Sequence, residues 1–488
     1  MDSITYFDDR IHLTAYKPRI RNIANELTLA KVTEEAFFIC DLGEIIKKHE
    51  EWISQLPRVQ PHYAVKCNDS RLVLQTLAGL GTGFDCASKA EMRKVLDLGV
   101  NPSRIIFANP TKQNSHVRAA AENNVVRMTF DNEGELHKIK ALHPRAQLVI
   151  RIRCDAEKAQ CQLGMKFGVL VEEAPDLLEA AHALGLDVIG VSFHVGSGCM
   201  DPPVFDRAIK SCKWLFGVGK EIGFEMNFLD IGGGFPGNTG TSIKEIASVV
   251  NGSLAAHFPE ECGVEIIAEP GRFYVASAFT LTTLVHSIRE IKGNETGDNK
   301  YMYYINDGVY GSFNCVIYDH AVVHPELLKN YEDDKKTYES SIWGPTCDGL
   351  DNVCPREMMP KLDMGDWLLF RNMGAYTLVA GGTFNGFPTP KIYFVASYES
   401  WCQLKEFMNP EEFVTDNVPI LMKAGVGCNR DAVGWASVAG AAGSSSGCLN
   451  NVLNVFEQPL PAVVCDSPNN TNNYLDNVFQ FPANIQAQ

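Results

Sequence analysis

The sequence predicts an α/β chain with a (β/α)₈ barrel of the TIM type, followed by a second, mostly antiparallel β domain. From residue 61 onward, short apolar or β-branched runs alternate with longer amphipathic stretches, a pattern typical of βα units around a parallel sheet. After about residue 275 the pattern changes to Thr-, Tyr- and Val-rich segments separated by Gly, Asp, Asn and Pro, which is typical of antiparallel strands.

Eight runs are predicted as the barrel strands, with amphipathic stretches that fit helices between them. The predicted strands are 61–67, 82–86, 104–108, 125–130, 147–152, 188–194, 226–231 and 264–269. The predicted helices include 89–98, 114–123, 133–142, 172–183 and 203–221. A closed eight-stranded barrel is the economical arrangement of this series, and a doubly wound open sheet is the alternative.

A chain of 488 residues exceeds what one core usually fills, so we expect about two domains and a tail. The predicted division is an N-terminal segment (1–40) that joins the β domain, a barrel (41–278), a C-terminal antiparallel β domain (279–424) and a disordered tail (425–488). The polar segment 288–300 is predicted to be a loop tip.

Composition and charge exclude several function classes. No stretch approaches the roughly 20 apolar residues that span a bilayer, and Met1 to Ile20 lack the features of a secretory signal, which predicts a cytoplasmic protein without membrane contact. The 15 cysteines are scattered and show no zinc-ligand spacing, so we expect free thiols and no metal site. A net charge of −16 gives no argument for nucleic-acid binding.

Polar residues stand at the ends of the predicted strands, where the catalytic groups of a (β/α)₈ enzyme lie. They are Lys66, Asp85, Arg151, His194, the glycines 232–234, and Glu269 with the following Gly271 and Arg272. Lys66 follows the apolar Ala64 and Val65 and is a candidate Schiff-base former, because desolvation lowers the pKa of an amine. Taken singly, a lysine is more often a surface charge, and a lone His194 more often a core residue.

The run GGGFPG after the seventh strand also matches the dinucleotide pattern GxGxxG through Gly232, Gly234 and Gly237. Pro236 removes an amide donor, and the run lies in the seventh repeat instead of the first, so this interpretation is the weaker one. Consecutive glycines let backbone amides converge on an anion, and the loops after strands seven and eight are the usual phosphate site of this barrel. Arg272 can donate there.

A phosphate anchor, a lysine and an acid on one rim meet the requirements of pyridoxal phosphate. Glu269 is the candidate partner of the pyridine nitrogen, which its charge would keep protonated. The ring would then accept the electrons of the carbanion left by decarboxylation. A nicotinamide dehydrogenase is the distant alternative.

A series of motifs resembles the fold-type III, alanine-racemase-like enzymes, and within them the family of eukaryotic ornithine decarboxylases. The resemblance covers residues from about 30 to 400. The motifs are YAVKCN, GTGFDCASK, ANP, VSFHVGSGC, LDIGGGFPG, AEPGR, NDGVYGSFNC, YDHA, SSIWGPTCDGLD and NMGAYT. The resemblance implies decarboxylation of L-ornithine to putrescine and carbon dioxide, the entry step of polyamine biosynthesis, with pyridoxal 5′-phosphate as cofactor.

The resemblance also implies roles for single residues. Lys66 would hold the cofactor covalently, and Glu269 would pair with its ring nitrogen. The phosphate would be held by Ser197, the glycine run Gly232, Gly233 and Gly234, Gly271, Arg272 and Tyr376. The cofactor and the catalytic lysine would be lined by Asp85, Glu91, Arg151 and His194, of which Glu91 and His194 would also be catalytic.

By the same resemblance, Cys347 would return a proton after carbon dioxide leaves, although a cysteine alone is more often a buried filler. Asp319 and Asp348 would receive the distal ammonium of ornithine, and two carboxylates would select a diamine precursor over a neutral side chain. The walls of this pocket would be Tyr310, Tyr318 and Phe384.

The resemblance implies a head-to-tail homodimer, in which Cys347 and Asp348 reach the partner's active site and Lys166 pairs with Asp351 across the interface. Arg118 and Lys138 lie on predicted helices where relatives meet the regulatory protein antizyme, so antizyme binding is a further hypothesis. The tail differs from the vertebrate ending of the family.

Two other functions remain open within this resemblance. A catalytically inactive antizyme inhibitor would have lost cofactor contacts, whereas this chain retains them. An active paralogue could decarboxylate lysine, arginine or leucine, and no sequence gives the distances that select chain length. Departures from the family pattern include His62 before YAVKCN and the Gly164-Met165 pair.

Overall fold

The computed structural model describes residues 10–154, 159–161, 165–293, 297–329, 336–408 and 413–414. The predicted tail 425–488 and Gly164 lie outside the described residues. The predicted domain boundaries stay a prediction.

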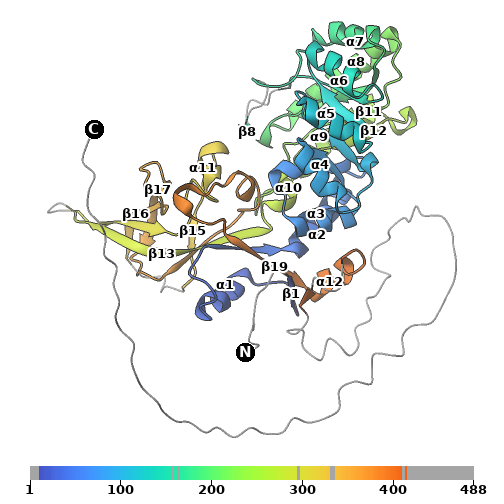
Figure 1. Cartoon of the computed structure of the whole chain (residues 1–488). Helices are drawn as coiled ribbons and strands as arrows, with labels where there is room; N and C mark the ends of the chain where they lie inside the picture. Colours follow the sequence, from blue (N-terminus) through green and yellow to red (C-terminus); the bar gives the residue numbers. More distant parts are fainter. Residues whose placement is uncertain are drawn as a thin grey trace, which may run out of the picture. The chain divides into compact units, whose positions relative to one another are not determined.

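The eight predicted parallel strands form a closed barrel (Figure 1). In order around it they are β3 (Gln60–Ala64), β4 (Gly83–Cys86), β5 (Ile105–Phe107), β6 (Arg127–Phe130), β7 (Gln147–Arg151), β9 (Asp187–Ser192), β11 (Phe228–Asp230) and β12 (Glu265–Ala268). β12 pairs in parallel with β3, which closes the ring. The barrel prediction is confirmed, and the open-sheet alternative is wrong.

Helices cover the outside of the barrel, one before its first strand and the others after successive strands (Figure 1). They are α2 (Leu42–Gln55), α3 (Arg71–Gly79), α4 (Lys89–Leu96), α5 (Asn114–Glu122), α6 (Glu133–Leu142), α7 (Ala174–Ala183), α8 (Pro203–Ile222) and α9 (Lys244–His257). α8 ends at Gly223, whose φ of 114° is left-handed and suits a glycine C-cap. Apolar side chains such as Ile106, Val149 and Ile267 form a separate buried cluster of strand residues.

The second sheet has ten strands and is mostly antiparallel. Its strands are β1 (Ile11–Thr14), β2 (Phe37–Asp41), β13 (Phe279–Ile291), β14 (Lys300–Ile305), β15 (Pro325–Leu327), β16 (Thr337–Trp343), β17 (Asn352–Pro360), β18 (Trp367–Phe370), β19 (Lys391–Ser397) and β20 (Phe413–Val414). β2 lies between β13 and β19, so a strand that precedes the barrel in sequence completes the sheet after it.

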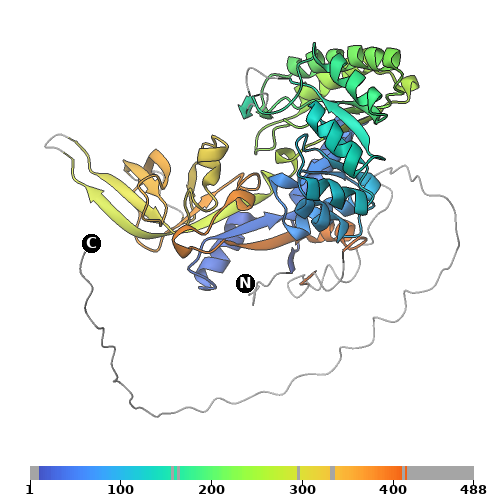
Figure 2. The ribbon, with the colours of Figure 1, turned by 45° about the horizontal axis from the view of Figure 1, so that its top comes forward.

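Figure 2 shows the yellow hairpin of β13 and β14 extending from the rest of this sheet. β13 continues to Ile291 and β14 begins at Lys300, so the predicted loop 288–300 is wrong at its start. The Thr- and Val-rich register of β13 pairs Ile288 with Tyr303, and this pairing extends the strand into the polar segment.

The remaining elements are short. They are α1 (Ile20–Leu29), α10 (Arg272–Val275), α11 (Asn314–Tyr318), α12 (Tyr398–Leu404), the 3₁₀ turns η1 (Val65–Cys67), η2 (Pro102–Arg104), η3 (Glu260–Cys262), η4 (Leu378–Ala380) and η5 (Phe384–Gly386), and the strand pair β8 (Ala159–Cys161) and β10 (Ser197–Cys199). Among the described helices, none is long and apolar enough to cross a bilayer.

A buried ion pair joins the loop after β5 to helix α6. Lys112 Nζ lies 2.9 Å from Glu135 Oε1, and the two side chains are 0% and 2% exposed. Nζ also donates to the carbonyl oxygen of Thr129 at 2.6 Å. Burial lowers the pKa of Lys112 to about 8, although Glu135 opposes this shift. Buried charges of this kind stabilise a fold only while both partners are present.

We expect Glu135→Gln to lower the free energy of unfolding by about 3 kcal/mol, because the Lys112 ammonium would stay buried without its counter-charge. Urea unfolding at pH 7 measures this change. The matched control is Glu133→Gln on the same helix, because Glu133 is exposed and its ion pair with His137, at 3.5 Å, is exposed as well. The control should change the free energy by less than about 0.5 kcal/mol. Equal costs for the two variants would contradict this interpretation.

His62 is a second buried group with a measurable consequence. It lies against Gly83, and burial lowers the pKa of its ring to about 3. The folded chain therefore keeps His62 neutral at pH 5, whereas the unfolded chain takes up a proton below about pH 6.5. Stability should fall as the pH drops from about 6.5 towards 3, because the unfolded state then binds the additional proton.

We expect His62→Phe to abolish this part of the acid sensitivity. Between pH 7 and pH 5 the wild-type chain should lose about 2 kcal/mol more unfolding free energy than the variant. Urea unfolding at pH 7, 6 and 5 compares the two. His137→Gln, at an exposed histidine, serves as the control and should keep the wild-type slope. A slope for His62→Phe that matches the wild type would show that His62 does not cause the effect.

Candidate active site

Lys66 and Asp85 form the centre of the barrel mouth. Ala64 is opposite Asp85 in the β3–β4 register, and Lys66 follows in η1, so Lys66 lies in a turn beyond the strand that the sequence predicted to contain it. Lys66 Nζ forms an ion pair with Asp85 Oδ2, and the Asp85 side chain is 0% exposed. Burial lowers the pKa of Lys66, but Asp85 and Glu269 outweigh it, so the net shift is upward.

Glu269 follows β12 directly. Its carboxyl group interacts with that of Asp230, a residue that the sequence analysis did not predict for the site. Both are buried, at 6% and 0% exposure. Burial raises the pKa of Glu269, and the charges of Asp230 and Asp85 raise it further. Asp230 ends β11 two positions before Gly232, a strand-end position that could have revealed it. The site therefore holds buried carboxyl groups in excess of its nearby cations.

His194 is neutral in this site. Burial, the charge of Arg151 and the charge of Lys66 lower the pKa of its ring well below the ordinary range. The Gly196 amide donates to His194 Nδ1 at 3.0 Å, so the neutral ring carries its proton on Nε2. Arg151 ends β7, and its guanidinium carbon lies 5.2 Å from the centre of the Phe167 ring.

The glycine run forms a tight cradle beside His194. Gly234 has a φ of 116°, and a Cβ there would lie 2.6 Å from Val195 Cγ2 and 2.8 Å from the Gly196 carbonyl oxygen. A Cβ on Gly233 would lie 2.7 Å from His194 Nε2, and one on Gly271 2.9 Å from Cys67 Cβ. Among the described residues, none accepts a hydrogen bond from the Gly233 or Gly234 amide. Gly232 instead donates to Asp230 Oδ1 at 2.8 Å.

Arg272 joins several of the predicted residues. It begins α10, and its Nη2 lies 3.1 Å from Ser197 Oγ and 2.6 Å from Asp319 Oδ2. Its guanidinium carbon lies 5.2 Å from the centre of the Tyr376 ring. The Tyr376 amide donates to the Cys67 carbonyl oxygen at 3.0 Å, which links Tyr376 to the turn that carries Lys66. Tyr376 adopts a left-handed φ of 55°, an unusual backbone for a bulky residue.

Glu91 has a structural role in this chain. Its amide donates to Ser88 Oγ at 3.2 Å, and its Oε2 accepts from the Ala87 amide at 2.6 Å, so it belongs to the N-terminal cap of α4. Burial raises the pKa of Glu91, while the Ala87 amide lowers it. The predicted catalytic role of Glu91 stays a prediction.

The other predicted residues form a second cluster on the β domain. Tyr310 donates a hydrogen bond to Asp348 Oδ2, and the Tyr310 and Phe384 rings are 4.6 Å apart. Cys347 is exposed, and its amide donates to Asn385 Oδ1 at 3.0 Å. Tyr318 is 71% exposed at the end of α11. Within the described residues, no hydrogen bond or ion pair joins Cys347 or Asp348 to Lys66, Asp85 or Glu269.

The residues predicted to meet partners differ in their surroundings. Asp351 is 1% exposed and accepts hydrogen bonds from Val309 and Thr346 of its own chain, so a partner's lysine could reach it only if these contacts changed. Lys166 and Arg118 are exposed. Lys138 on α6 forms an ion pair with Glu135 at 2.5 Å.

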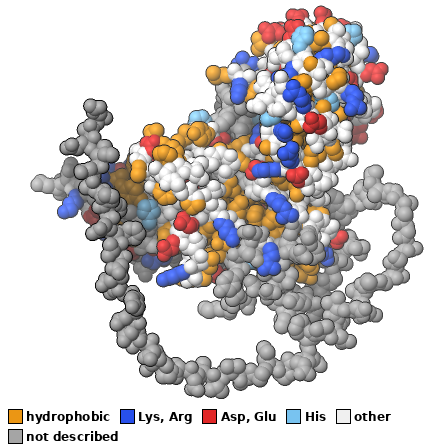
Figure 3. Space-filling model, in the orientation of Figure 1, with side chains coloured by type: hydrophobic (Ala, Val, Ile, Leu, Met, Phe, Trp, Pro, Cys, Tyr) orange, Lys and Arg blue, Asp and Glu red, His pale blue; other side chains and the backbone are white. Residues whose placement is uncertain are grey.

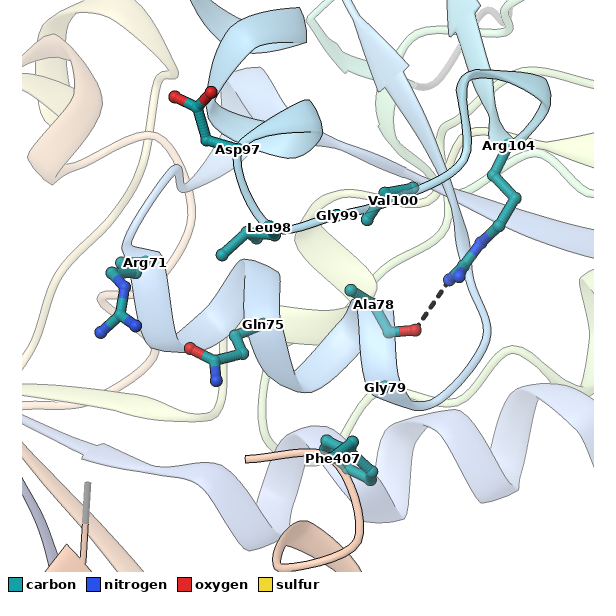
Figure 4. A pocket seen from close by; sticks show the side chains of 10 residues that line it. All are labelled: Arg71, Gln75, Ala78, Gly79, Asp97, Leu98, Gly99, Val100, Arg104 and Phe407. Atoms are coloured by element: carbon teal, nitrogen blue, oxygen red, sulfur yellow. Dashed lines mark hydrogen bonds between the residues drawn. The ribbon is translucent and has the colours of Figure 1, made fainter. Parts of the chain in front are cut away.

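A hollow of about 380 Å³ lies outside the barrel, between α3 and the loop that precedes β5 (Figure 4). Arg104 points across it and donates to the Ala78 carbonyl oxygen at 2.7 Å, which caps the end of α3. Arg71, Gln75 and Asp97 also line it. None of the predicted site residues lies there, so the barrel mouth remains the candidate site.

The barrel mouth fits pyridoxal phosphate on the chemistry of its groups. The unused amides of Gly233 and Gly234 and the guanidinium of Arg272 suit a phosphate. A cationic ring nitrogen would offset the buried carboxyl groups of Glu269 and Asp230, and Lys66 offers an amine. Asp85 Oδ1 is buried and accepts no hydrogen bond from the described residues, so an acceptor is also available.

Comparisons with known proteins agree with this fit. A family model described as the pyridoxal-binding domain of pyridoxal-dependent decarboxylases matches residues 42–276. Ornithine decarboxylase of Rattus norvegicus is 53% identical over 386 residues, which are 77% of this chain and 84% of that protein. Antizyme inhibitor 2 of Xenopus laevis is 49% identical over 391 residues, 78% of this chain and 85% of that protein.

A solved structure shows that the fold is also that of a decarboxylase of this kind. The arginine decarboxylase of Paramecium bursaria Chlorella virus has a TM-score of 0.74 and 38% identity, and the match covers 77% of this chain and 100% of that one. Sequence identity at this level, the closed barrel and the charged mouth point the same way. The chain belongs to the family of pyridoxal-dependent decarboxylases that includes the ornithine decarboxylases.

Proposed function

We propose that this chain decarboxylates L-ornithine to putrescine and carbon dioxide with pyridoxal 5′-phosphate as cofactor. The observation that carries the proposal is the constellation on one rim: Lys66 paired with Asp85, and Arg272 in contact with Ser197. The identity of 53% to an ornithine decarboxylase supports the same substrate.

The residues of this chain would divide the work as follows. Lys66 would hold the cofactor, and the glycine cradle with Arg272 would bind its phosphate. Pyridoxal phosphate supplies a protonated ring that accepts the electron pair released when the carboxylate leaves the substrate. Glu269 would hold the proton on the ring nitrogen, because a buried carboxylate is stabilised by an adjacent cation. Neutral His194, fixed by Gly196, would present a ring face to the cofactor.

Cys347 and the acidic pair would act at the other end of the substrate. Cys347 would deliver a proton to the carbon that lost carbon dioxide, which suits an exposed thiol on a loop. Asp319 and Asp348 would bind the distal ammonium, and the hydrogen bond from Tyr310 fixes Asp348 in its place. The same hydrogen bond lowers the pKa of Asp348, so its carboxylate stays charged.

The similarity to an antizyme inhibitor supports a second candidate, an inactive chain that acts by binding antizyme. The retained contacts of Lys66, Arg272 and Glu269 favour the enzyme, because an inactive chain has no need to keep buried charges that destabilise its fold. Decarboxylation of lysine, arginine or leucine is the third candidate, and the two carboxylates argue against leucine.

We expect the purified chain, supplied with pyridoxal phosphate, to release carbon dioxide from ornithine faster than from lysine, arginine or leucine. Lys66→Ala should lose at least 10³-fold in rate and should not retain the cofactor after gel filtration, because its covalent anchor is gone. The control is Lys94→Ala, because Lys94 is a half-exposed lysine on α4 that pairs with Asp69. The control should keep both properties.

Three other outcomes of this experiment would contradict parts of the proposal. Carbon dioxide release from a different amino acid would reassign the pocket formed by Asp319 and Asp348. Undiminished turnover in Lys66→Ala would refute the role of Lys66. A chain that binds no cofactor and releases no carbon dioxide would contradict the enzyme and leave the antizyme inhibitor.

A homodimer with shared sites is part of this proposal. Cys347 and Asp348 contact no barrel-mouth residue of their own chain by hydrogen bond or ion pair within the described part. Apolar residues next to them in sequence and around the end of α11 are exposed, with Leu350 and Tyr318 each at 71% and Val322 at 80%. Figure 3 shows hydrophobic side chains gathered over the region of α11. Such a surface supports burial against a second copy.

We expect a mixture of Lys66→Ala and Cys347→Ala chains to regain activity that neither variant has alone. In a mixed dimer, one site would combine the intact Lys66 of one chain with the intact Cys347 of the other. The measurement is carbon dioxide release after the two chains are mixed and allowed to exchange. A mixture of Lys66→Ala with Lys66→Arg is the control and should stay inactive. No recovery in an exchanged mixture would show that each site is built from one chain.

A further inference from the structure

Arg272 and Asp319 form a buried ion pair that links two subsites of the barrel mouth. Arg272 Nη2 lies 2.8 Å from Asp319 Oδ1 and 2.6 Å from Oδ2, and the two side chains are 9% and 8% exposed. The same nitrogen lies 3.1 Å from Ser197 Oγ. One guanidinium therefore touches both a residue proposed for the phosphate and the residue proposed for the distal ammonium.

The two subsites share the one positive charge of this guanidinium. Nη2 lies within hydrogen-bond distance of both oxygens of Asp319 and of the Ser197 hydroxyl, which Nε also approaches at 3.4 Å. A phosphate at Arg272 and Ser197 would add a further acceptor and a second negative charge at the same place. Two anions that share one buried cation weaken each other's binding. An anion in the phosphate subsite would therefore loosen the hold of Arg272 on Asp319.

A carboxylate of Asp319 that is released from Arg272 can bind another cation. Asp319 is 5% exposed, so a negative charge that loses its cation there is costly unless another cation replaces it. A primary ammonium of a diamine is such a cation, and it can reach the mouth with the substrate. The phosphate would draw Arg272 away from Asp319, and the ammonium would replace Arg272 as the cation beside Asp319. In the same way, the ammonium would free Arg272 to bind the phosphate.

We propose that the Arg272–Asp319 pair couples the two subsites, so that an anion at the phosphate subsite strengthens the binding of a primary ammonium at Asp319. The coupling must be reciprocal, because both ligands bias one equilibrium. The identity of the two subsites rests on the proposed function. The two ligands should therefore bind in an order. While the phosphate subsite is empty, the chain binds diamines weakly, because Arg272 pairs with the Asp319 carboxylate that the diamine needs.

The experiment titrates the cofactor-free chain by calorimetry with 4-deoxypyridoxine 5′-phosphate, a cofactor analogue that has no aldehyde and cannot condense with amines. Saturating putrescine should lower the dissociation constant of this analogue about five-fold or more, and the analogue should lower that of putrescine by the same factor. 4-Deoxypyridoxine, which lacks the phosphate, should show no such dependence. An analogue affinity that putrescine leaves unchanged would overturn the proposal.

A variant pair separates coupling from a merely structural role. Asp319→Asn keeps the shape of the side chain and removes the competing charge, so it should bind the phosphate analogue several-fold more tightly than the wild type and gain nothing further from putrescine. If Asp319 only holds Arg272 in position, the variant will bind the analogue more weakly, which contradicts the proposal. Asp348→Asn is the matched control, because Asp348 is held by Tyr310 and not by Arg272. Its analogue affinity should equal that of the wild type.

Both variants are checked by circular dichroism for a wild-type melting temperature, and the wild-type titrations decide the question if Asp319→Asn does not fold. The outcome is independent of catalysis. Coupling in a chain that releases no carbon dioxide would keep this inference and remove the proposed function. Active decarboxylation without coupling would remove this inference alone.

Discussion

The closure of the barrel is the constraint on which the site depends. β12 pairs with β3, so the first and last strands are neighbours, and the Ala64 amide donates to the Pro270 carbonyl oxygen at 3.2 Å. Lys66 and Glu269, which are far apart in the sequence, therefore follow adjacent strands and interact electrostatically. An open sheet would carry them on separate edges. The charges of the rim act together only because the ring is closed.

The site concentrates buried charge that the fold alone does not need. Lys66 is balanced by Asp85 and Arg272 by Asp319, whereas burial raises the pKa of both Glu269 and Asp230, and the charge of Asp85 raises both further. Buried carboxyl groups without matching cations destabilise a folded chain, and such clusters are typical of functional sites. By contrast, the buried charge of Lys112 is matched by Glu135, which also pairs with Lys138, as expected of a structural cluster.

The fold was largely predictable because each barrel strand is an apolar run bounded by amphipathic helices, and the glycine run and Glu269 stand directly after their strands. The cap formed by Ser88 and Glu91 also had a visible signal, the pattern Ser-x-x-Glu, although the sequence analysis did not predict it. The Arg272–Asp319 contact had no signal in the sequence. It joins the AEPGR and YDHA motifs across two domains, and no periodicity reports which side chains meet in space. The turn at Lys66 was missed because its apolar neighbours resemble a strand.

The Arg272–Asp319 pair also bears on substrate selection. Relatives named for ornithine and for arginine resemble this chain, so the barrel alone does not decide which amino acid is used. Arg272 begins α10 after the last barrel strand, whereas Asp319 follows α11 in the part of the chain that contains the second sheet. The position of the acceptor for the distal ammonium is therefore set by how the segment after α11 packs against the barrel. A small shift of that segment would alter the reach of the pocket and the hold on the phosphate together, because one guanidinium serves both.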